Sequence, residues 1–534
     1  MISSTVIGAL ERHAAEQPDR LFVEVVAAGK RTRLTYGDLA DATRRFAKGY
    51  VNLGVKPGDQ VTILTPHRAE QYPAYLGVMR AGAVPSFLTP LNVKSDPEKY
   101  WPSQRILFDR VKPDLIVTDA AGVDLIRQNL PDLEVALVAI DAIAPGAVDA
   151  EWMPPAVQEK ALIQYSSGTT GPRKAVALNH QAVVQQSRSY AKAIGLGASD
   201  RIASWLPLYH DMGLITAFMT PLVMGTAVVS LDPFEWVARP GMLFDEVVNF
   251  AATLCWLPNF AYMHLVRAAP QKDWDLSSLR AVINCSEPCR GTTFDAFFER
   301  FSDCGLKRES LQTCYAMAEN VYAVTQTPMG KSVAVLGERG VAFGGSDILS
   351  AGTPIEGVEV RLANEENLQV EDGQLGQIAI RSELCIERYY GASTSALDQN
   401  GWYHTGDLGV SVEGELFVIG RLDDVIVTRG KNIFAHEVEA ALSMLDGIKP
   451  GRCAVLGVSN DAAGTSELVV VAETTGSKVS RELRADISRT VEYGFGIAPS
   501  GVYFVPEAWI MKSSSGKIAR RDNVQKLARY LAEA

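Results

Sequence analysis

The segment YSSGTTGPRKAVALNH, from Tyr165 to His180, has the residue types of an anion-binding loop. Its hydroxyl groups are donors, and its glycines let backbone N–H groups approach a phosphate because no Cβ intervenes. The candidate ligands of the anion are Ser166, Ser167, Gly168, Thr169, Thr170, Gly171 and Lys174. Such a composition is usual in flexible linkers, but the apolar stretches ALIQY and AVAL on its two sides favour a strand–loop–strand unit.

A second glycine–lysine pair, Gly516 and Lys517 in KSSSGKIARR, lies near the C-terminus. Neither segment fits a P-loop, which needs a glycine directly before the lysine and a serine or threonine directly after it. Arg173 and Ala175 occupy those places in the first segment, and Ile518 follows the lysine in the second. A nucleotide site built from these lysines must therefore be of another kind.

Four further segments contain side chains that could bind a nucleotide or an acid. They are SWLPLYHDMGL at 204–214, NCSEP at 284–288, CYAMAEN at 314–320 and GWYHTGDLG at 401–409. Each has an ordinary explanation when taken alone, since an aspartate in a glycine-rich turn is usually a turn former and a lone glutamate is usually a solvated helix residue. Their value lies in their occurrence together and in this order.

Composition excludes several classes of function. The net charge of −11 repels phosphate backbones and anionic membranes, so nucleic acid is not an expected partner. Seven scattered cysteines without a C-x-x-C pair argue against a disulfide framework and a zinc site. The N-terminal segment lacks the basic start and apolar core of an export signal, which predicts a cytoplasmic protein.

One uncharged run, Met212 to Leu231, is long enough to span a bilayer. Its Pro221, Gly225 and threonines instead predict a buried helix, a turn and a strand. We therefore expect no stable membrane insertion.

The elements that must position these residues follow an α/β pattern. Short apolar strands alternate with amphipathic stretches, and 534 residues at about 150 per domain suggest three or four domain-sized units. We predict a large N-terminal domain over 1–421, with helix-covered β-sheets and a small β-barrel-like antiparallel subdomain near 340–421. A joint at 422–424 would connect it to a small α+β C-terminal domain over 425–534.

The ordered motifs resemble those of the adenylate-forming superfamily, which includes acyl-CoA synthetases, fatty acyl-AMP ligases, luciferases and the adenylation domains of peptide synthetases. The resemblance covers essentially the whole chain and is closest in motif detail to the fatty acyl-AMP ligase branch. It implies ATP-dependent activation of a carboxylic acid to an acyl-AMP with release of pyrophosphate. It also implies ATP and Mg²⁺ as cofactors and a small C-terminal domain that moves.

The same resemblance implies nucleotide-binding roles. The segment from Ser166 to Lys174 matches the family loop that holds the β- and γ-phosphates. Tyr315 would stack on adenine, and Glu319 would help hold Mg²⁺, a cation that prefers carboxylates and waters. Asp407 and Arg421 would bind the ribose and phosphate region, and Ser286 and Glu287 would line the adenine pocket.

Catalytic and conformational roles follow in the same way. Lys517 would bridge the substrate carboxylate and the α-phosphate and stabilise the charge-rich transition state. Asp423 matches the hinge position, and Gly430 matches the position that pantetheine slides past. His210 would lie beside the acyl group, although a histidine satisfied at a helix start is the structural alternative.

The resemblance places Trp205, His210, Met212 and Gly213 around the acyl pocket. The uncharged run after His210 favours an apolar slot, and WLPNFAYM offers no acid for the ammonium of an amino acid. We therefore predict a hydrophobic carboxylic acid as the substrate. The sequence gives no indication of the oligomeric state.

The acceptor of the acyl group stays open between two alternatives. The motif details favour a fatty acyl-AMP ligase, which stops at the adenylate or passes the acyl group to a carrier protein or partner enzyme. The segment 327–354 is shorter than the insertion that disfavours CoA in that branch, which favours an acyl-CoA synthetase that uses CoA. We expect CoA, with the carrier protein as the alternative; a phosphate-releasing ATPase and a non-catalytic nucleotide-binding module are the alternatives from other classes.

Overall fold

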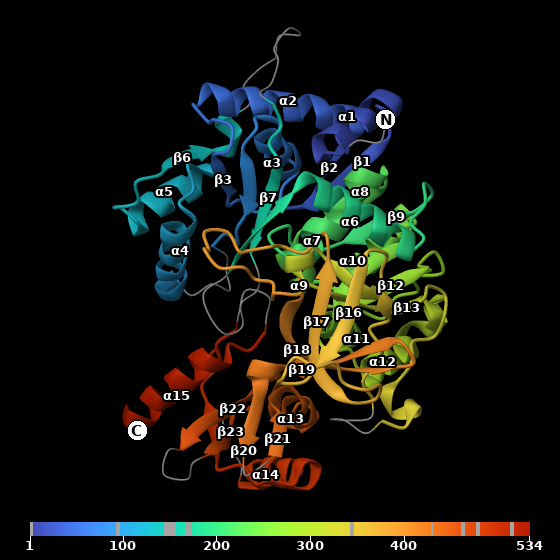
Figure 1. Cartoon of the computed structure of the whole chain (residues 1–534), viewed down its shortest axis with the longest axis vertical. Coiled ribbons are helices and arrows are strands. Elements are labelled where there is room, and N and C mark those ends of the chain that lie inside the picture. Colours follow the sequence, from blue (N-terminus) through green and yellow to red (C-terminus); the bar gives the residue numbers. More distant parts are fainter. Residues whose placement is uncertain are drawn as a thin grey trace.

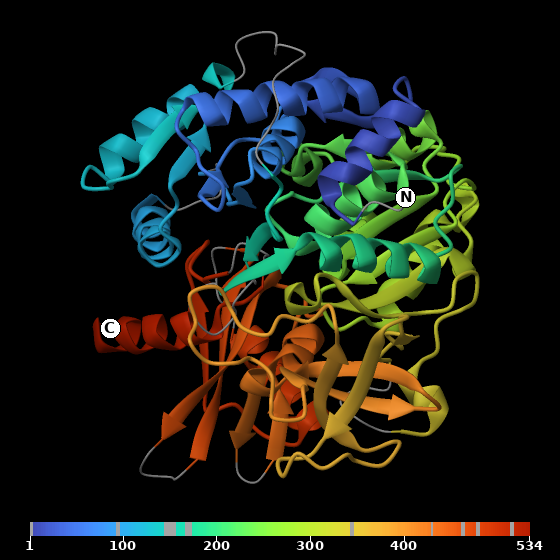
Figure 2. The same ribbon diagram turned by 45° about the horizontal axis from the view of Figure 1, so that its top comes forward.

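Two large β-sheets form the core of the molecule in the computed structural model, which describes residues 4–91, 97–143, 156–165, 174–341, 347–428, 431–460, 465–476, 481–512 and 517–533. Figure 1 shows these sheets and their helices above a smaller C-terminal part coloured orange to red, and Figure 2 shows the same arrangement from another side.

The first sheet has six strands, which are parallel except for the last pair, β7 with β8. Its order is β6 (Ala136–Ala139), β5 (Leu115–Thr118), β3 (Gln60–Ile63), β4 (Val84–Phe87), β7 (Lys160–Tyr165) and β8 (Ala175–Asn179). Helix α2 (Tyr36–Asn52) leads from the second sheet into β3, and the connections between strands of this sheet contain α3 (Gln71–Arg80), α4 (Pro97–Val111) and α5 (Ala120–Asn129). Strands β3, β4 and β5 are buried at every position, as expected of parallel strands covered on both faces.

The second sheet has nine strands and a parallel centre. Its order is β15 (Thr353–Pro354), β14 (Ala323–Gln326), β13 (Leu311–Ala316), β12 (Ala281–Cys285), β11 (Leu254–Pro258), β9 (Arg201–Ser204), β10 (Ala227–Leu231), β1 (Leu21–Ala27) and β2 (Lys30–Thr35). Its helices are α1 (Val6–Glu16), α6 (His180–Ala193), α7 (Asp211–Leu214), α8 (Thr220–Met224), α9 (Pro233–Ala238), α10 (Met242–Phe250), α11 (Asn259–Ala268) and α12 (Gly291–Phe301).

The uncharged run of 212–231 folds as the sequence predicts. It forms α7, the π-helical turn η2 (Ile215–Met219) and α8, turns at Gly225 with φ of 79°, and continues as β10. Phe218 from this run lies 4.8 Å from Tyr72 of α3 and 6.1 Å from Phe22 of β1, measured between ring centroids. The run is therefore an internal layer that packs the two sheets together. Within the described ranges, no helix combines the length and the apolar character needed to cross a bilayer.

The antiparallel subdomain is an open sheet. Its four strands follow chain order: β16 (Val358–Ala363), β17 (Leu375–Ser382), β18 (Tyr403–Val412) and β19 (Glu415–Arg421). Within the described residues β16 and β19 do not pair with each other, so the barrel-like closure that we expected is wrong. Four strands are too few to close around a core, and Val410, Phe417 and Ile419 pack instead against Leu336 and Ile348.

The C-terminal part has its own hydrophobic core, which includes Ile433, Val438, Leu468 and Ile487. It begins after the 3₁₀ turn η7 (Leu422–Asp424). Its strands are β20 (Val425–Thr428) with β21 (Lys431–Phe434), and β22 (Ile448–Asn460), β23 (Thr465–Thr474) and β24 (Gly501–Val505) in a second sheet. Its helices are α13 (Ala435–Leu442), α14 (Arg481–Phe495) and α15 (Arg520–Glu533).

A charged contact joins the C-terminal part to the larger part. Arg290, which precedes α12, pairs with Asp347 at 2.8 Å, and its second terminal nitrogen lies 3.9 Å from Oε1 of Glu437 on α13. Burial raises the pKa of Glu437 to about 7, against the opposing effect of Arg290. The carboxyl group is therefore close to its titration point in this contact at neutral pH.

We expect the Glu437→Gln variant to gain thermal stability relative to the wild type as the pH rises from about 5 to about 8. The folded-state pKa of about 7 lies above the ordinary value of 4.5, so folding favours the protonated form, and ionisation of Glu437 costs stability as the pH rises through that window. Glutamine stays neutral throughout. Differential scanning calorimetry at both pH values measures the gain, and a constant difference from the wild type would contradict it. Glu482→Gln, at an exposed position of α14, is the control.

Candidate functional site

Tyr315, Asp407 and Arg421 form a connected cluster at the end of β13. The Tyr315 hydroxyl donates a hydrogen bond to Oδ2 of Asp407 at 2.5 Å, and Arg421 lies 3.7 Å from Oδ1 of the same carboxylate. The register of β18 and β19 places Asp407 directly opposite Arg421. Three residues from separate motifs therefore meet at one carboxylate, as the resemblance leads us to expect for a ribose site.

The backbone also contributes to this cluster. Gly406 has φ of 76°, and a Cβ there would lie 3.1 Å from Nη2 of Arg421. A glycine thus allows the turn that brings Asp407 beneath the guanidinium. Burial raises the pKa of Asp407, while the charges of Arg421 and Lys517 act in the opposite direction.

Lys517 lies within electrostatic range of the large-domain site. Its positive charge favours the ionised form of both Asp407 and Asp211: it opposes the rise that burial causes in the pKa of Asp407, and it contributes to the lowered pKa of Asp211. Burial lowers the pKa of Lys512, which precedes Lys517 in the chain, and the negative charge of Glu287 opposes this effect. The C-terminal part thus presents its lysines to the face that carries Tyr315 and Asp407.

Glu319 is a buried carboxylate, 8% exposed, in the 3₁₀ turn η5 (Ala318–Asn320). Gln164 on β7 holds this turn, because its side-chain amide donates at 3.0 Å to the carbonyls of Ala318 and Val321. Oε1 of Glu319 accepts a hydrogen bond of 2.7 Å from the Tyr389 hydroxyl. Burial raises the pKa of Glu319, against the effects of Tyr389 and Lys174.

The donor set around Glu319 suits Mg²⁺. Mg²⁺ is held in nucleotide sites by one or two carboxylates together with waters and substrate phosphates, so a single buried glutamate beside a phosphate site is sufficient. A tighter cage of three or more His, Cys, Asp or Glu side chains is not found among the described residues.

Lys174, the residue directly before β8, is the one predicted loop residue that the structure describes. Its ammonium lies 4.6 Å from the ring centroid of Tyr389, on the same tyrosine that binds Glu319. The other loop residues, Ser166, Ser167, Gly168, Thr169, Thr170 and Gly171, lie outside the described residues, as does Gly430.

His210 is the N-cap of α7 and contacts the next residue. Its Nδ1 lies 2.7 Å from Oδ1 of Asp211, which also accepts from the backbone N–H of Met212 at 2.9 Å. Burial alone would raise the pKa of Asp211, but the hydrogen bond from His210 and the charge of Lys517 lower it. A carboxylate partner requires the proton on Nδ1, which leaves Nε2 of neutral His210 as an acceptor.

The NCSEP segment contains the end of β12 and the turn that follows it. Ser286 has φ of 79°, a left-handed conformation that is rare outside glycine. The Glu287 side chain accepts a 3.2 Å hydrogen bond from the backbone N–H of Phe260, in the first turn of α11. The carboxylate of Glu287 therefore satisfies an otherwise free helix N–H group, in addition to any part in an adenine pocket.

The predicted acyl residues form a packed wall. Trp205 stacks on Trp236 of α9 with ring centroids 3.7 Å apart and planes 7° apart. Met212 is buried, and a Cβ on Gly213 would lie 2.3 Å from the carbonyl oxygen of Pro207. A residue with any side chain would therefore displace the loop that leads into α7.

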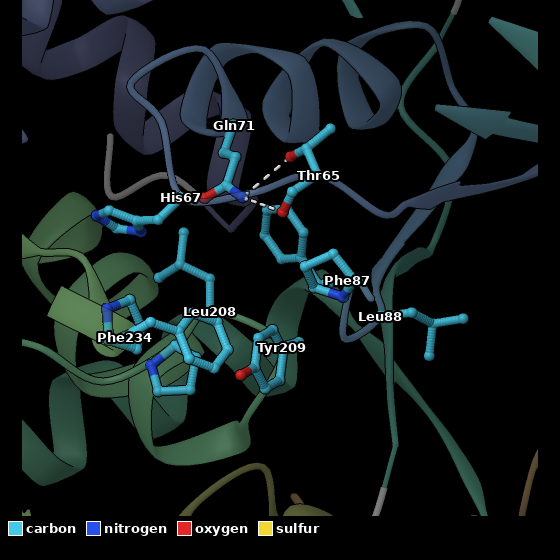
Figure 3. A pocket seen from close by; sticks show the side chains of 11 residues that line it. Thr65, His67, Gln71, Phe87, Leu88, Leu208, Tyr209 and Phe234 are labelled. Atoms are coloured by element: carbon cyan, nitrogen blue, oxygen red, sulfur yellow. Dashed lines mark hydrogen bonds between the residues drawn. The ribbon is translucent and has the colours of Figure 1, made fainter. Parts of the chain in front are cut away.

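A small pocket lies next to this wall, between the carboxyl ends of strands from both sheets. Figure 3 shows Gln71 on one side, where its amide donates at 3.0 Å to Thr65, and Leu208, Tyr209 and Phe234 on the other. Its free volume of about 20 Å³ is enough for a single water molecule. Trp205, His210, Met212 and Gly213 do not line it.

Comparison with known proteins gives the family. A family model described as AMP-binding enzyme matches residues 10–390, which is more than half of the chain. The chain belongs to the AMP-binding enzyme family. The match ends at the residue after Tyr389 and therefore includes every described candidate residue within 1–421 except Asp407 and Arg421.

Members of this AMP-binding family with similar sequences include two named ligases. A medium-chain-fatty-acid acyl-carrier-protein ligase, JamA of Moorena producens, is 27% identical, with 97% of this chain and 94% of the relative covered. The long-chain-fatty-acid AMP ligase FadD32 of Mycobacterium marinum is also 27% identical, with 87% and 84% covered. A solved structure from work on fatty acyl-adenylate ligases of E. coli and L. pneumophila superposes with a TM-score of 0.89 at 23% identity, over 99% of each chain, and shows that the fold is shared.

Sequence reasoning missed three residues of this candidate site. Asp211 stands beside His210 in the quoted HDMGL motif, where an acid next to a histidine was a usable signal. Tyr389 and Tyr403 are joined by a 2.7 Å hydrogen bond between hydroxyls, although they belong to different segments. No spacing in the sequence signals that contact, because it depends on how the segment 383–402 folds back.

Proposed function

We propose that the chain activates a hydrophobic carboxylic acid with ATP, forms an acyl-AMP and releases pyrophosphate. The convergence of Tyr315, Asp407 and Arg421 with Lys517 in range is the observation that carries this proposal. It combines an aromatic ring, a ribose-type carboxylate and two cations from both parts of the molecule. A carboxylate and ATP are both anions, so such cations are what their reaction requires.

Each residue has a distinct task in this proposal. Tyr315 stacks on adenine, Asp407 accepts hydrogen bonds from the ribose hydroxyls, and Arg421 faces the ribose and the phosphate. Lys174, with the loop that precedes it, holds the β- and γ-phosphates, and Glu319 holds Mg²⁺. When bound, Mg²⁺ neutralises phosphate charge.

Lys517 serves the chemical step. Its ammonium places a positive charge between the acid and the α-phosphate, which lowers the repulsion as the carboxylate oxygen approaches phosphorus in line. The P–O bond to the leaving group breaks as the new P–O bond forms, so pyrophosphate departs and the acyl-AMP remains. His210, with its proton held at Nδ1 by Asp211, presents Nε2 to the acyl side of the site.

The apolar wall of Trp205, Trp236 and Met212 supports a hydrophobic acid. The relatives are named for medium-chain and long-chain fatty acids, which supports the same class. They are also named as acyl-carrier-protein and AMP ligases, which favours a carrier protein over CoA as the second acceptor. CoA stays the alternative.

The C-terminal part supports a two-step cycle. Asp423 lies in η7, the turn between two separate hydrophobic cores, and its neighbour Leu422 is 50% exposed. We propose residues 422–424 as the hinge between a domain over 1–421 and one over 425–534, since short exposed turns absorb such rotations. The seven cysteines are free, which fits a reducing compartment such as the cytoplasm.

Product analysis tests the proposal directly. The protein is incubated with ATP, Mg²⁺ and a panel of fatty, aromatic and amino acids, and mass spectrometry follows acyl-AMP and pyrophosphate. We expect both products with the hydrophobic acids. Release of orthophosphate, or a preference for free amino acids, would contradict the proposal. Parallel reactions with CoA and with a phosphopantetheinylated carrier protein separate the two acceptors.

A further inference from the structure

Tyr389 contacts two residues that the proposed function assigns to different tasks. Its hydroxyl donates to Oε1 of Glu319 at 2.7 Å, and its ring centroid lies 4.6 Å from the ammonium of Lys174. The tyrosine therefore lies between a negative and a positive group. Within the described part of the chain, no ion pair joins Lys174 and Glu319 directly.

A further hydroxyl orients Tyr389. The Tyr389 and Tyr403 hydroxyl oxygens are 2.7 Å apart. Since Tyr389 gives its proton to Glu319, it accepts one from Tyr403. Tyr403 begins β18, the strand that also carries Asp407, so the chain of hydroxyls starts on the same strand as the ribose-site carboxylate.

Backbone hydrogen bonds connect the segment around Tyr389 to the turn that carries Glu319 and to the strand next to Lys174. The N–H of Ile386 donates to the carbonyl of Glu319 at 2.9 Å, and the N–H of Tyr390 donates to the carbonyl of Ala175, next to Lys174, at 2.9 Å. The segment 386–390 therefore bridges the turn that carries Glu319 and the strand that begins after Lys174. Tyr389 is fixed on both sides of its ring.

We propose that Tyr389 is a positioning residue that keeps Lys174 and Glu319 apart and aimed at the phosphates and at Mg²⁺. Opposite charges at this range attract each other, and a direct ion pair would neutralise both before a nucleotide arrives. The ring of Tyr389 binds the ammonium of Lys174 by a cation–π contact, and its hydroxyl donates a hydrogen bond to one carboxylate oxygen of Glu319. This inference rests on the proposed function, because it assumes the phosphate and Mg²⁺ roles of the two partners.

Two substitutions separate the contacts of Tyr389. Tyr389→Phe keeps the ring under Lys174 and loses the hydrogen bond to Glu319, whereas Tyr389→Leu loses both. Tyr390→Phe is the matched control, because its hydroxyl contacts Gln60 and its ring lies beneath Lys160, away from Glu319. Calorimetric titration measures Mg²⁺ affinity in protein loaded with α,β-methylene-ATP, which cannot release pyrophosphate.

We expect Tyr389→Phe to weaken Mg²⁺ binding by about 10-fold, as the loss of a hydrogen bond to a charged group predicts, with nucleotide affinity close to that of the wild type. Tyr389→Leu should in addition weaken binding of the nucleotide by roughly 3- to 10-fold, since the cation–π contact is lost. Steady-state kinetics should show the same division, with the Mg²⁺ requirement raised in both variants and KM for ATP raised only in the leucine variant.

Wild-type affinity for Mg²⁺ in Tyr389→Phe, or an equal loss in Tyr390→Phe, would overturn the inference while leaving the proposed function intact. A wild-type protein that binds neither the analogue nor Mg²⁺ would instead contradict the proposed function, and the inference with it. If the leucine variant fails to fold, the comparison of the two phenylalanine variants decides alone.

Discussion

The Lys517→Ala variant is expected to release pyrophosphate about 10²- to 10³-fold more slowly than the wild type, as the loss of one transition-state donor predicts. The reason is electrostatic: the charge of Lys517 acts on both Asp407 and Asp211, which line the face where we propose that the acid meets the α-phosphate. Without the ammonium, two anions approach each other with one less compensating charge. Pyrophosphate release, coupled to a colorimetric phosphate assay, measures the loss.

The loss should be confined to the first half-reaction. Acyl transfer from synthetic acyl-AMP to the acceptor should continue at close to the wild-type rate, because the α-phosphate bond has already been made. Lys449→Ala is the control, since Lys449 belongs to the same C-terminal part and pairs with Glu507 on the surface. Wild-type pyrophosphate release by Lys517→Ala would remove Lys517 from the catalytic role.

The second large effect is expected at Asp407. We predict that Asp407→Asn lowers kcat/KM for ATP by about 100-fold, because a neutral amide replaces a carboxylate that would accept from two ribose hydroxyls. The amide oxygen can still accept from Tyr315, so the turn at Gly406 should keep its shape. The effect should appear mainly in KM for ATP, with the KM for the acid nearly unchanged.

Tyr315→Phe provides the graded comparison. It keeps the ring that we propose to stack on adenine and loses only the 2.5 Å hydrogen bond to Asp407, so a smaller decrease of about 10-fold is expected. Thermal unfolding of both variants checks that the buried cluster still folds. An asparagine variant with wild-type KM for ATP would show that Asp407 does not bind the nucleotide.

Local sequence patterns were sufficient to predict most elements of the fold. The proline, glycine and threonine residues of 212–231 predicted the helix, the turn at Gly225 and β10, because the conformation of a turn depends on residues that are adjacent in the sequence. The pairing of Asp407 with Arg421 was foreseeable from the short antiparallel unit between them. The open edge of the four-stranded sheet could not be foreseen, since closure of a sheet depends on what packs against its face rather than on its own strands.

The members of the candidate site that belong to motifs could be selected from the sequence, whereas the members that depend on long-range contacts were missed. Tyr389 is 70 residues from Glu319 in sequence, and the contact exists because the segment before β18 folds over the turn η5. A tyrosine in a segment of turns has no distinctive spacing. Asp211 could have been found, because its neighbour His210 was already selected.

Gly213 has a consequence for protein engineering. Because a Cβ at this position would lie 2.3 Å from the Pro207 carbonyl oxygen, combinatorial libraries that randomise the proposed acyl wall should keep this position as glycine. Phe260, 42% exposed and packed edge-on against Trp205 at 6.1 Å, can accept new side chains without displacing backbone. Directed evolution toward other acids should therefore vary positions on α11 such as Phe260 and leave Gly213, in the loop into α7, unchanged.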